Sequence, residues 1–139
     1  MDPNKDDLVI IIDDNLDNVL IFSSCLDELE VSYLSRASGF AFFKYLDAHP
    51  HQRIALILLD INLPIESGFE VIARIRKDSR LNGVTVVAVT ASDDLQTEKR
   101  ASQMGFDGYF RKPIDINQFP ADIKRILETG IRIWQGVYD

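Results

Sequence analysis

Residues 54–60 read Ile-Ala-Leu-Ile-Leu-Leu-Asp, an unbroken apolar run that a single carboxylate closes. A run this short and this hydrophobic is typical of a β-strand that is buried on both faces of a sheet. Burying a carboxylate is costly unless the group is paired with a cation or bound to a metal. The stretch therefore predicts a central strand whose last residue, Asp60, meets charged partners from elsewhere in the chain.

Three other apolar runs also lead into polar residues. Asp13 and Asp14 follow residues 8–12, Thr90 and Ala91 follow residues 84–89, and residues 109–110 lead through Arg111 to Lys112. In an open parallel sheet, ligands bind in the crevice beyond the carboxyl ends of the strands. We therefore expect three aspartates, one hydroxyl and one lysine to converge on a single point.

Strand-like and helix-like segments alternate along the chain. The expected strands are 8–12, 31–35, 54–59, 84–89 and 108–110, and the expected helices are 16–29, 38–48, 67–77, 92–103 and 118–129. Strict alternation is typical of βαβ units around a parallel sheet. The pattern predicts an α/β fold of the flavodoxin-like, doubly wound class, with strand order 2-1-3-4-5. In that order the first and third strands are neighbours, so Asp13 and Asp14 are expected beside Asp60.

Capping residues refine the expected helix boundaries. Asn15 stands where an N-cap of the first helix belongs, and Gly105 is placed to end the fourth helix. Pro120 is tolerated only in the first turn of the last helix, which predicts a cap near Asn117. The fourth helix carries few large apolar residues, so we expect it to be the least firmly anchored.

Composition limits the classes of function. With 139 residues and 46% apolar content, the chain is expected to form one domain. Its formal charge of −7 argues against a nucleic-acid partner, because such affinity comes from Lys and Arg that neutralise phosphates. The single cysteine, Cys25, excludes an internal disulfide and fits a reducing compartment. The sequence shows neither a signal segment nor a membrane-spanning stretch, so we expect a cytoplasmic protein with no membrane partner.

Four motifs stand at the expected strand ends. They are Ile-Asp-Asp-Asn at 12–15, Leu-Asp-Ile-Asn-Leu-Pro at 59–64, Val-Thr-Ala at 89–91 and Tyr-Phe-Arg-Lys-Pro-Ile at 109–114. Together and in this order they resemble the response-regulator receiver domain, the phosphoacceptor half of two-component signalling. The resemblance covers about residues 7–129, the expected receiver domain. We expect residues 130–139 to form an apolar tail that is too short to be an output domain.

The resemblance implies a role for each residue at this crevice. Asp60 is the phosphoacceptor, a carboxylate that attacks phosphorus to form an aspartyl phosphate. Lys112, which a cis bond to the following proline aims inward, pairs with a phosphoryl oxygen. The Thr90 hydroxyl binds a second oxygen. Ala91 leaves room for its backbone N–H to approach the phosphoryl group. Asn62 is a second residue that binds this group.

The resemblance also implies a divalent cation. Asp14 and Asp60 coordinate it directly, the backbone carbonyl of Asn62 contributes another oxygen, and Asp13 acts through water. Mg²⁺, or Mn²⁺ in its place, suits such a site because hard ions prefer oxygen ligands. The cation also relieves the repulsion among the carboxylates.

Signalling in this family runs through an aromatic residue, here Tyr109. When Thr90 moves toward the phosphoryl group, it vacates space into which the Tyr109 ring turns. The implied output is a changed surface on the fourth helix, fifth strand and fifth helix. The implied partners are a histidine kinase or a histidine phosphotransfer protein and, downstream, a target protein or a second copy of the chain. The domain is not an enzyme with a separate substrate, because it catalyses only its own phosphoryl transfer and dephosphorylation.

Other interpretations stay open at this point. A degenerate receiver would bind partners without phosphorylation, although no active-site position is missing. An Asp-nucleophile phosphatase of the haloacid-dehalogenase kind needs its nucleophile at the end of the first strand, whereas Asp60 ends the third. A flavin-binding module needs a glycine- and hydroxyl-rich loop after the first strand, where Asp13 and Asp14 would repel a phosphate. Tyr109 could also be a fixed, half-buried aromatic residue rather than a switch.

Overall fold

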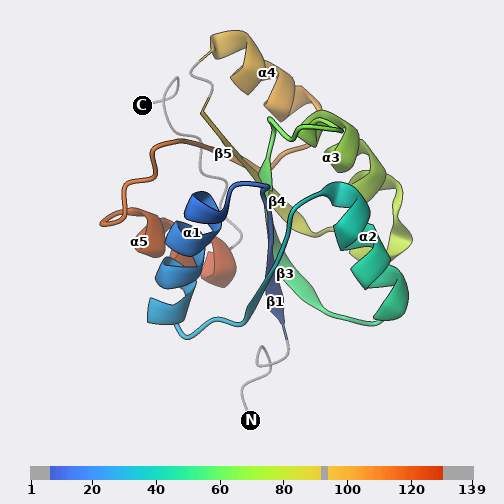
Figure 1. The fold of residues 1–139 in the computed structure, drawn as a ribbon, viewed down its shortest axis with the longest axis horizontal. Helices are drawn as coiled ribbons and strands as arrows, with labels where there is room; N and C mark the ends of the chain where they lie inside the picture. Colours follow the sequence, from blue (N-terminus) through green and yellow to red (C-terminus); the bar gives the residue numbers. More distant parts are fainter. Residues whose placement is uncertain (1–6, 92–93, 130–139) are drawn as a thin grey trace.

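The computed structural model describes residues 7–91 and 94–129, which form one parallel sheet flanked by helices (Figure 1). The strands are β1 (Leu8–Ile12), β2 (Tyr33–Arg36), β3 (Ile54–Asp60), β4 (Thr85–Thr90) and β5 (Gly108–Arg111). Their order is β2-β1-β3-β4-β5, which confirms the predicted topology. β3 is central and its residues 56–60 are all buried, as the apolar run predicts.

Helices cover both faces of the sheet (Figure 1). They are α1 (Leu16–Glu28), α2 (Gly39–Ala48), α3 (Gly68–Lys77), α4 (Leu95–Gln103) and α5 (Phe119–Thr129), with a short 3-10 turn at Ser79–Leu81. α1 and α5 lie on one face, where Phe22 and Phe119 pack with the strands. α2, α3 and α4 lie on the other face, over a cluster that includes Phe42 and Ile72. Because both faces are covered, the strands are apolar along their length.

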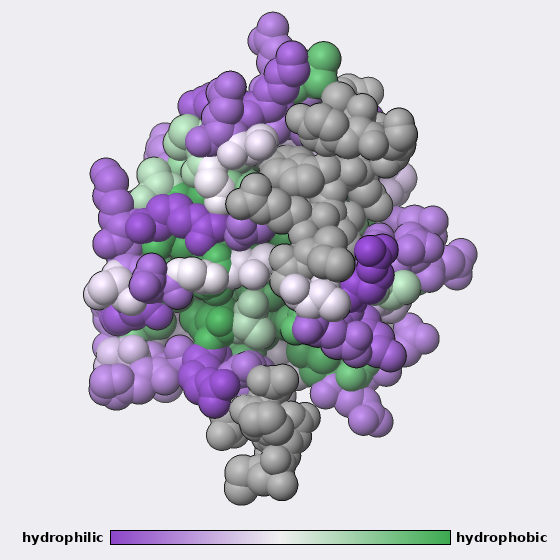
Figure 2. Space-filling model, turned by 180° about the vertical axis from the view of Figure 1, so that it is seen from behind, coloured by the Kyte–Doolittle hydropathy of each residue, from purple (hydrophilic) through white to green (hydrophobic). Residues whose placement is uncertain are grey.

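The outer surface differs from this apolar interior. Seen from behind, hydrophilic residues line the edges of the molecule, and apolar residues show mainly near its middle (Figure 2). Cys25 is buried on the inner side of α1. None of the helices in the described ranges is both long enough and apolar enough to cross a lipid bilayer.

Several helix ends follow the predicted caps. The Asn15 side chain accepts the N–H groups of Asp17 and Asn18, which confirms it as the N-cap of α1. Gly105 follows α4 with a φ of +100°, a conformation that favours glycine. Pro120 lies in the first turn of α5, where its missing N–H leaves no helical hydrogen bond unmade.

Several predicted boundaries differ from the observed ones by one to three residues; β2, for example, spans 33–36 rather than 31–35. α4 begins at Leu95 rather than at residue 92, because Asp94 is its N-cap. The turn before α5 is capped by Asp115, whose carboxylate accepts the N–H groups of Asn117 and Gln118. Several residues of capping type stand close together in both segments, and the tertiary packing decides which one is used. The predicted tail at 130–139 lies outside the described residues.

Candidate functional site

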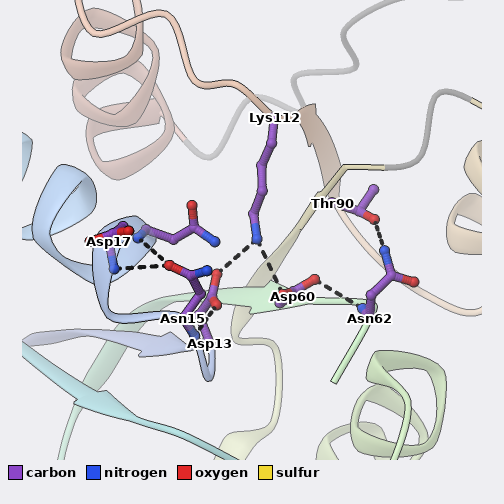
Figure 3. A network of polar contacts seen from close by, with 8 residues as sticks. Asp13, Asn15, Asp17, Asp60, Asn62, Thr90 and Lys112 are labelled. Carbon is purple, nitrogen blue, oxygen red and sulfur yellow. Dashed lines mark hydrogen bonds and ion pairs between the residues drawn. The ribbon is translucent and has the colours of Figure 1, made fainter. Parts of the chain in front are cut away.

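The carboxyl ends of β1, β3, β4 and β5 bring the predicted polar residues to one edge of the sheet (Figure 3). β3 and β4 each end one residue later than predicted, so Asp60 and Thr90 belong to the strands themselves. Their backbones are therefore held by sheet hydrogen bonds rather than by a loop. Asp13 and Asp14 follow β1 directly, on the strand next to β3.

Asp13, Asp14 and Asp60 form an acidic cluster. One carboxylate oxygen from each residue lies within 4.8 Å of the other two. Asp13 and Asp60 are buried and Asp14 is exposed, so the cluster opens to solvent on the Asp14 side. Asp13 Oδ1 also accepts the N–H of Asn15 at 2.9 Å, which orients this carboxylate.

Lys112 supplies the cation that the buried carboxylates require. Its Nζ lies 3.0 Å from Asp13 Oδ2 and 3.2 Å from Asp60 Oδ2, and its side chain is 14% exposed. The residue follows β5, and its peptide bond to Pro113 is cis. In Figure 3 the side chain extends to a point between the two carboxylates. Lys112 therefore ties the ends of β1, β3 and β5 together.

The electrostatics of the site are set by burial. Burial raises the pKa of the Asp60 carboxyl above its ordinary value, and the neighbouring charge of Asp13 acts in the same direction. The N–H of Asn62, which donates to Asp60 Oδ1 at 2.9 Å, and the ammonium of Lys112 oppose the rise. The net rise in pKa means that the ionised Asp60 is still short of compensating positive charge.

The donor set fits a hard divalent cation. Three carboxylates and one ammonium leave two uncompensated negative charges when all four groups are ionised. Ions such as Mg²⁺ take oxygen ligands, bind one or two carboxylates and keep several waters. The exposed Asp14 gives such an ion access to water and to further oxygen ligands on the open side.

Asn62 links Asp60 to Thr90. Its backbone N–H holds Asp60 Oδ1, and its side-chain Nδ2 donates to Thr90 Oγ1 at 2.6 Å. Thr90 is completely buried at the end of β4, and Ala91 after it is exposed. The position of the Thr90 hydroxyl therefore depends on the loop that follows Asp60.

Hydrogen bonds hold the loop between β3 and α3 in place. Gly68 donates to Ile61 O at 2.8 Å, and a Cβ at Gly68 would lie only 2.7 Å from Asp60 O. Glycine therefore lets α3 begin directly against the end of β3. Glu66 Oε1 accepts the N–H of Phe40, in the first turn of α2, at 2.9 Å. Sequence reasoning missed this role of Glu66, because a contact between residues 26 positions apart leaves no periodic signal.

Tyr109 lies in β5 and is 1% exposed. It belongs to the core cluster that also contains Ala101 of α4. The structure thus shows the ring in a buried position. A second position of the ring, which the switch hypothesis requires, stays a prediction.

Known proteins share this sequence pattern and this fold. A family model for the response regulator receiver domain matches residues 9–124. The polar-differentiation response regulator DivK of Brucella anthropi is 34% identical over 119 residues, which cover 86% of this chain and 94% of DivK. The phosphorylated cyanobacterial phytochrome response regulator RcpA superimposes with a TM-score of 0.77 at 22% identity, over 89% of this chain and 95% of RcpA. The Mn²⁺-bound response regulator Rcp1 gives a TM-score of 0.73 at 21% identity, over 90% and 94%. At these identities the two structures show a common fold.

Proposed function

This chain belongs to the response regulator receiver domain family, and we propose that Asp60 is the residue on which it accepts a phosphoryl group. The family and its phosphoacceptor signalling role are those predicted from the sequence, and the alternative functions are not favoured. One observation carries the assignment to Asp60. It is a buried carboxylate at the end of the central strand, paired with Lys112 and clustered with two more carboxylates. We assign residues 7–129 to the receiver domain.

The proposed reaction transfers a phosphoryl group from a phosphohistidine nitrogen to a carboxylate oxygen. An O–P bond forms at Asp60 while the P–N bond of the donor breaks, and the electron pair of that bond stays on the donor imidazole. Lys112 Nζ, 3.2 Å from Asp60 Oδ2, pairs with an oxygen of the incoming group. The Thr90 hydroxyl and the backbone N–H of Ala91 bind the other oxygens. The chain catalyses only this transfer to itself and the later dephosphorylation, in which water takes the phosphoryl group from Asp60 and inorganic phosphate leaves.

Receiver domains hold a divalent cation at an acidic cluster of this kind. We assign Mg²⁺, with Mn²⁺ as a substitute, to Asp14, Asp60 and the backbone carbonyl of Asn62, with Asp13 acting through water. When bound, the cation supplies positive charge that offsets the crowded oxygens of the carboxylate and the phosphoryl group. Lys112 Nζ lies 3.0 Å from Asp13 Oδ2 and 3.2 Å from Asp60 Oδ2, so its ammonium bridges the two carboxylates.

Intact-mass measurement tests the assignment. With acetyl phosphate and Mg²⁺, the wild-type protein should gain one phosphoryl group, and EDTA should prevent the gain. Asp60→Asn should show no adduct. Asp27→Asn, which changes an exposed aspartate of α1, is the matched control and should be modified like the wild type. An adduct on Asp60→Asn would show that another residue is the acceptor.

The phosphodonor we propose is a histidine kinase or a histidine phosphotransfer protein. A groove of about 580 Å³ runs between α1 and the start of α5, and α1 begins soon after Asp13 and Asp14 of the acidic cluster. Leu20 and Ile116 line it and are 66% and 62% exposed, and Leu16, next to the α1 cap, is also exposed. Exposed apolar residues that border a reactive site favour a protein as the donor, because a small phosphodonor needs no such contact.

Comparing a histidine kinase with acetyl phosphate as the phosphodonor distinguishes an effect on protein docking from an effect on phosphoryl transfer. Leu20→Ser should slow transfer from a purified histidine kinase by roughly ten- to a hundredfold, because burying a leucine is worth about 1.5–3 kcal/mol. The same variant should react with acetyl phosphate at the wild-type rate. Met104→Ser, at the far end of α4, is the control and should change neither rate. If Leu20→Ser leaves kinase transfer unchanged, the groove is not the docking site.

Downstream, we propose that phosphorylation is read by a target protein or a second copy of the chain. The surface involved is formed by α4, β5 and α5 and is called the output face below. α4 buries only the side chains of Glu98 and Ala101, so a small change beneath it is enough to move it. Tyr109 of β5 lies in the same core cluster as Ala101 of α4, and Thr90 ends the neighbouring strand β4. The phosphoacceptor role of the family and the free thiol of Cys25 support a cytoplasmic location.

A further inference from the structure

Glu98 is an unusual residue for the inner side of a helix. α4 buries two side chains, Ala101 and Glu98, and Glu98 is 3% exposed. Its Oε1 atom is enclosed and has no hydrogen-bond partner in the part of the chain that the structure describes. A helix that covers a core ordinarily places an apolar side chain at such a position.

The buried Glu98 carboxyl weakens the packing of α4 against the core. A buried oxygen that has lost water without gaining a donor costs free energy. Ala101, the other buried side chain, contributes little apolar area in compensation. Apart from the guanidinium of Arg100, which lies 4.1 Å from the centroid of the Phe69 ring, little therefore holds the middle of α4 in its docked position. A displacement that returns the carboxylate to water recovers part of the cost.

The C-terminal end of α4 is held much more firmly. Gly105 turns the chain directly after the helix, and its carbonyl accepts from Nε and Nη2 of Arg76 at 3.1 and 2.6 Å. Arg76 also donates to Val84 O at 2.6 Å and to Asp107 Oδ2 at 2.8 Å. One side chain of α3 thus joins the start of β4 to the turn between α4 and β5. The hydrogen bonds of Arg76 therefore hold the C-terminal end of α4 in place.

The other end of α4 lies toward the phosphorylation site. Its N-cap, Asp94, comes soon after Thr90, the last residue of β4. The Tyr109 ring lies in the same core cluster as Ala101. If the helix turns about Gly105, its N-terminal part and Glu98 move most, because they lie farthest from the fixed end.

We infer that Glu98 keeps the docked position of α4 only slightly favoured, so that phosphorylation of Asp60 displaces the helix about its fixed end at Gly105. The inference rests on the proposed function, in which the output face reports phosphorylation. An input at Asp60 shifts α4 only if the two positions of the helix differ little in free energy. Glu98 therefore sets the sensitivity of the output, and Arg76 sets the point about which the helix turns.

Amide hydrogen exchange of α4 tests this role. Glu98→Met replaces the carboxyl with an apolar side chain of similar length. In the unphosphorylated variant, exchange of the α4 amides should be roughly tenfold or more slower than in the wild type. Gln96→Met, on the exposed side of the same helix, is the matched control and should leave exchange unchanged. Beryllofluoride with Mg²⁺, a phosphoryl mimic, should speed α4 exchange in the wild type and have a smaller effect in Glu98→Met.

A second variant guards against misfolding of the first. Glu98→Gln keeps the shape and removes the charge, so its exchange should fall between the wild type and Glu98→Met. If both variants exchange as fast as the wild type or faster, the inference is overturned. Failure of the proposed function gives a different result: acetyl phosphate does not modify wild-type Asp60, whatever residue 98 is. Asp60 could be modified while beryllofluoride leaves amide exchange of wild-type α4 unchanged. In that case α4 does not respond to phosphorylation, and both the proposed output face and the role of Glu98 in signalling are refuted.

Discussion

Replacing Lys112 with Met removes the ammonium that bridges Asp13 and Asp60 while keeping most of the length of the side chain. The two carboxylates lie 3.0 and 3.2 Å from Nζ, and their side chains are 1% and 6% exposed. Removing one partner of a buried ion pair costs about 3–5 kcal/mol, because the charge left behind is uncompensated. The cluster opens to solvent at Asp14, so we expect the lower end of this range, about 3 kcal/mol.

This loss of stability should depend on the metal. For a domain of this size, 1 kcal/mol corresponds to a change of about 3–5 °C in Tm, so Lys112→Met should lose roughly 10–15 °C in EDTA. A cation present at 100 times its Kd adds about 2.7 kcal/mol of stability. Because the variant lacks the competing ammonium, Mg²⁺ should raise its Tm by more than it raises that of the wild type.

Thermal unfolding followed by circular dichroism, with EDTA and with Mg²⁺, measures both effects. Lys124→Met, on the exposed side of α5, is the control and should unfold like the wild type under both conditions. Two results would refute the reasoning. One is an unchanged Tm of Lys112→Met in EDTA, and the other is an equal rise with Mg²⁺ in Lys112→Met and the wild type.

Three further predictions concern the same crevice. Because burial raises the pKa of Asp60, its ionised form destabilises the fold, so Asp60→Asn should raise Tm in metal-free buffer at neutral pH. This gain should shrink as the pH falls through the raised pKa and vanish below about pH 3.9, the unfolded value; a constant gain across a series of Tm against pH would contradict it. Asp14→Ala should lose most of the rise in Tm that Mg²⁺ gives the wild type, and a full response in a Mg²⁺ titration would exclude Asp14 as a ligand. Gly68→Ala should cost about 1–3 kcal/mol in urea unfolding, because its Cβ would lie 2.6 Å from Ile61 Cα, and an unchanged midpoint would show that the backbone has room.

The fold was predictable because its strands are buried on both faces. That burial makes each strand a short apolar run, and alternation with helices then implies a parallel sheet with crossover connections. The convergence of Asp13, Asp14, Asp60 and Lys112 follows from the same topology, since each residue stands at a strand end. The roles of these residues came from the resemblance to a family and stay proposals.

Other features of the structure could not be predicted from the sequence. Two hydrogen bonds join segments that are distant in the sequence. Glu66 accepts the N–H of Phe40, and Arg76 donates to the carbonyl of Gly105. Glutamate and arginine are also common on exposed surfaces, so neither bond can be recognised from the sequence. The burial of Glu98 contradicts the polar pattern of α4, because periodicity alone assigns a glutamate to the solvent side. Sequence reasoning also missed the role of Asp115, which caps the turn before α5, because several residues of capping type stand close together there.

The proposed function depends above all on Asp60 as the residue that carries the phosphoryl group. The most direct measurement is peptide mapping by mass spectrometry, after treatment with acetyl phosphate and Mg²⁺ and reduction with borohydride, which converts an aspartyl phosphate to homoserine. We expect homoserine at position 60, in the peptide that contains the end of β3, and at no other aspartate. Phosphate on His49, His51 or Ser92, or homoserine at another position with Asp60 intact, would contradict it.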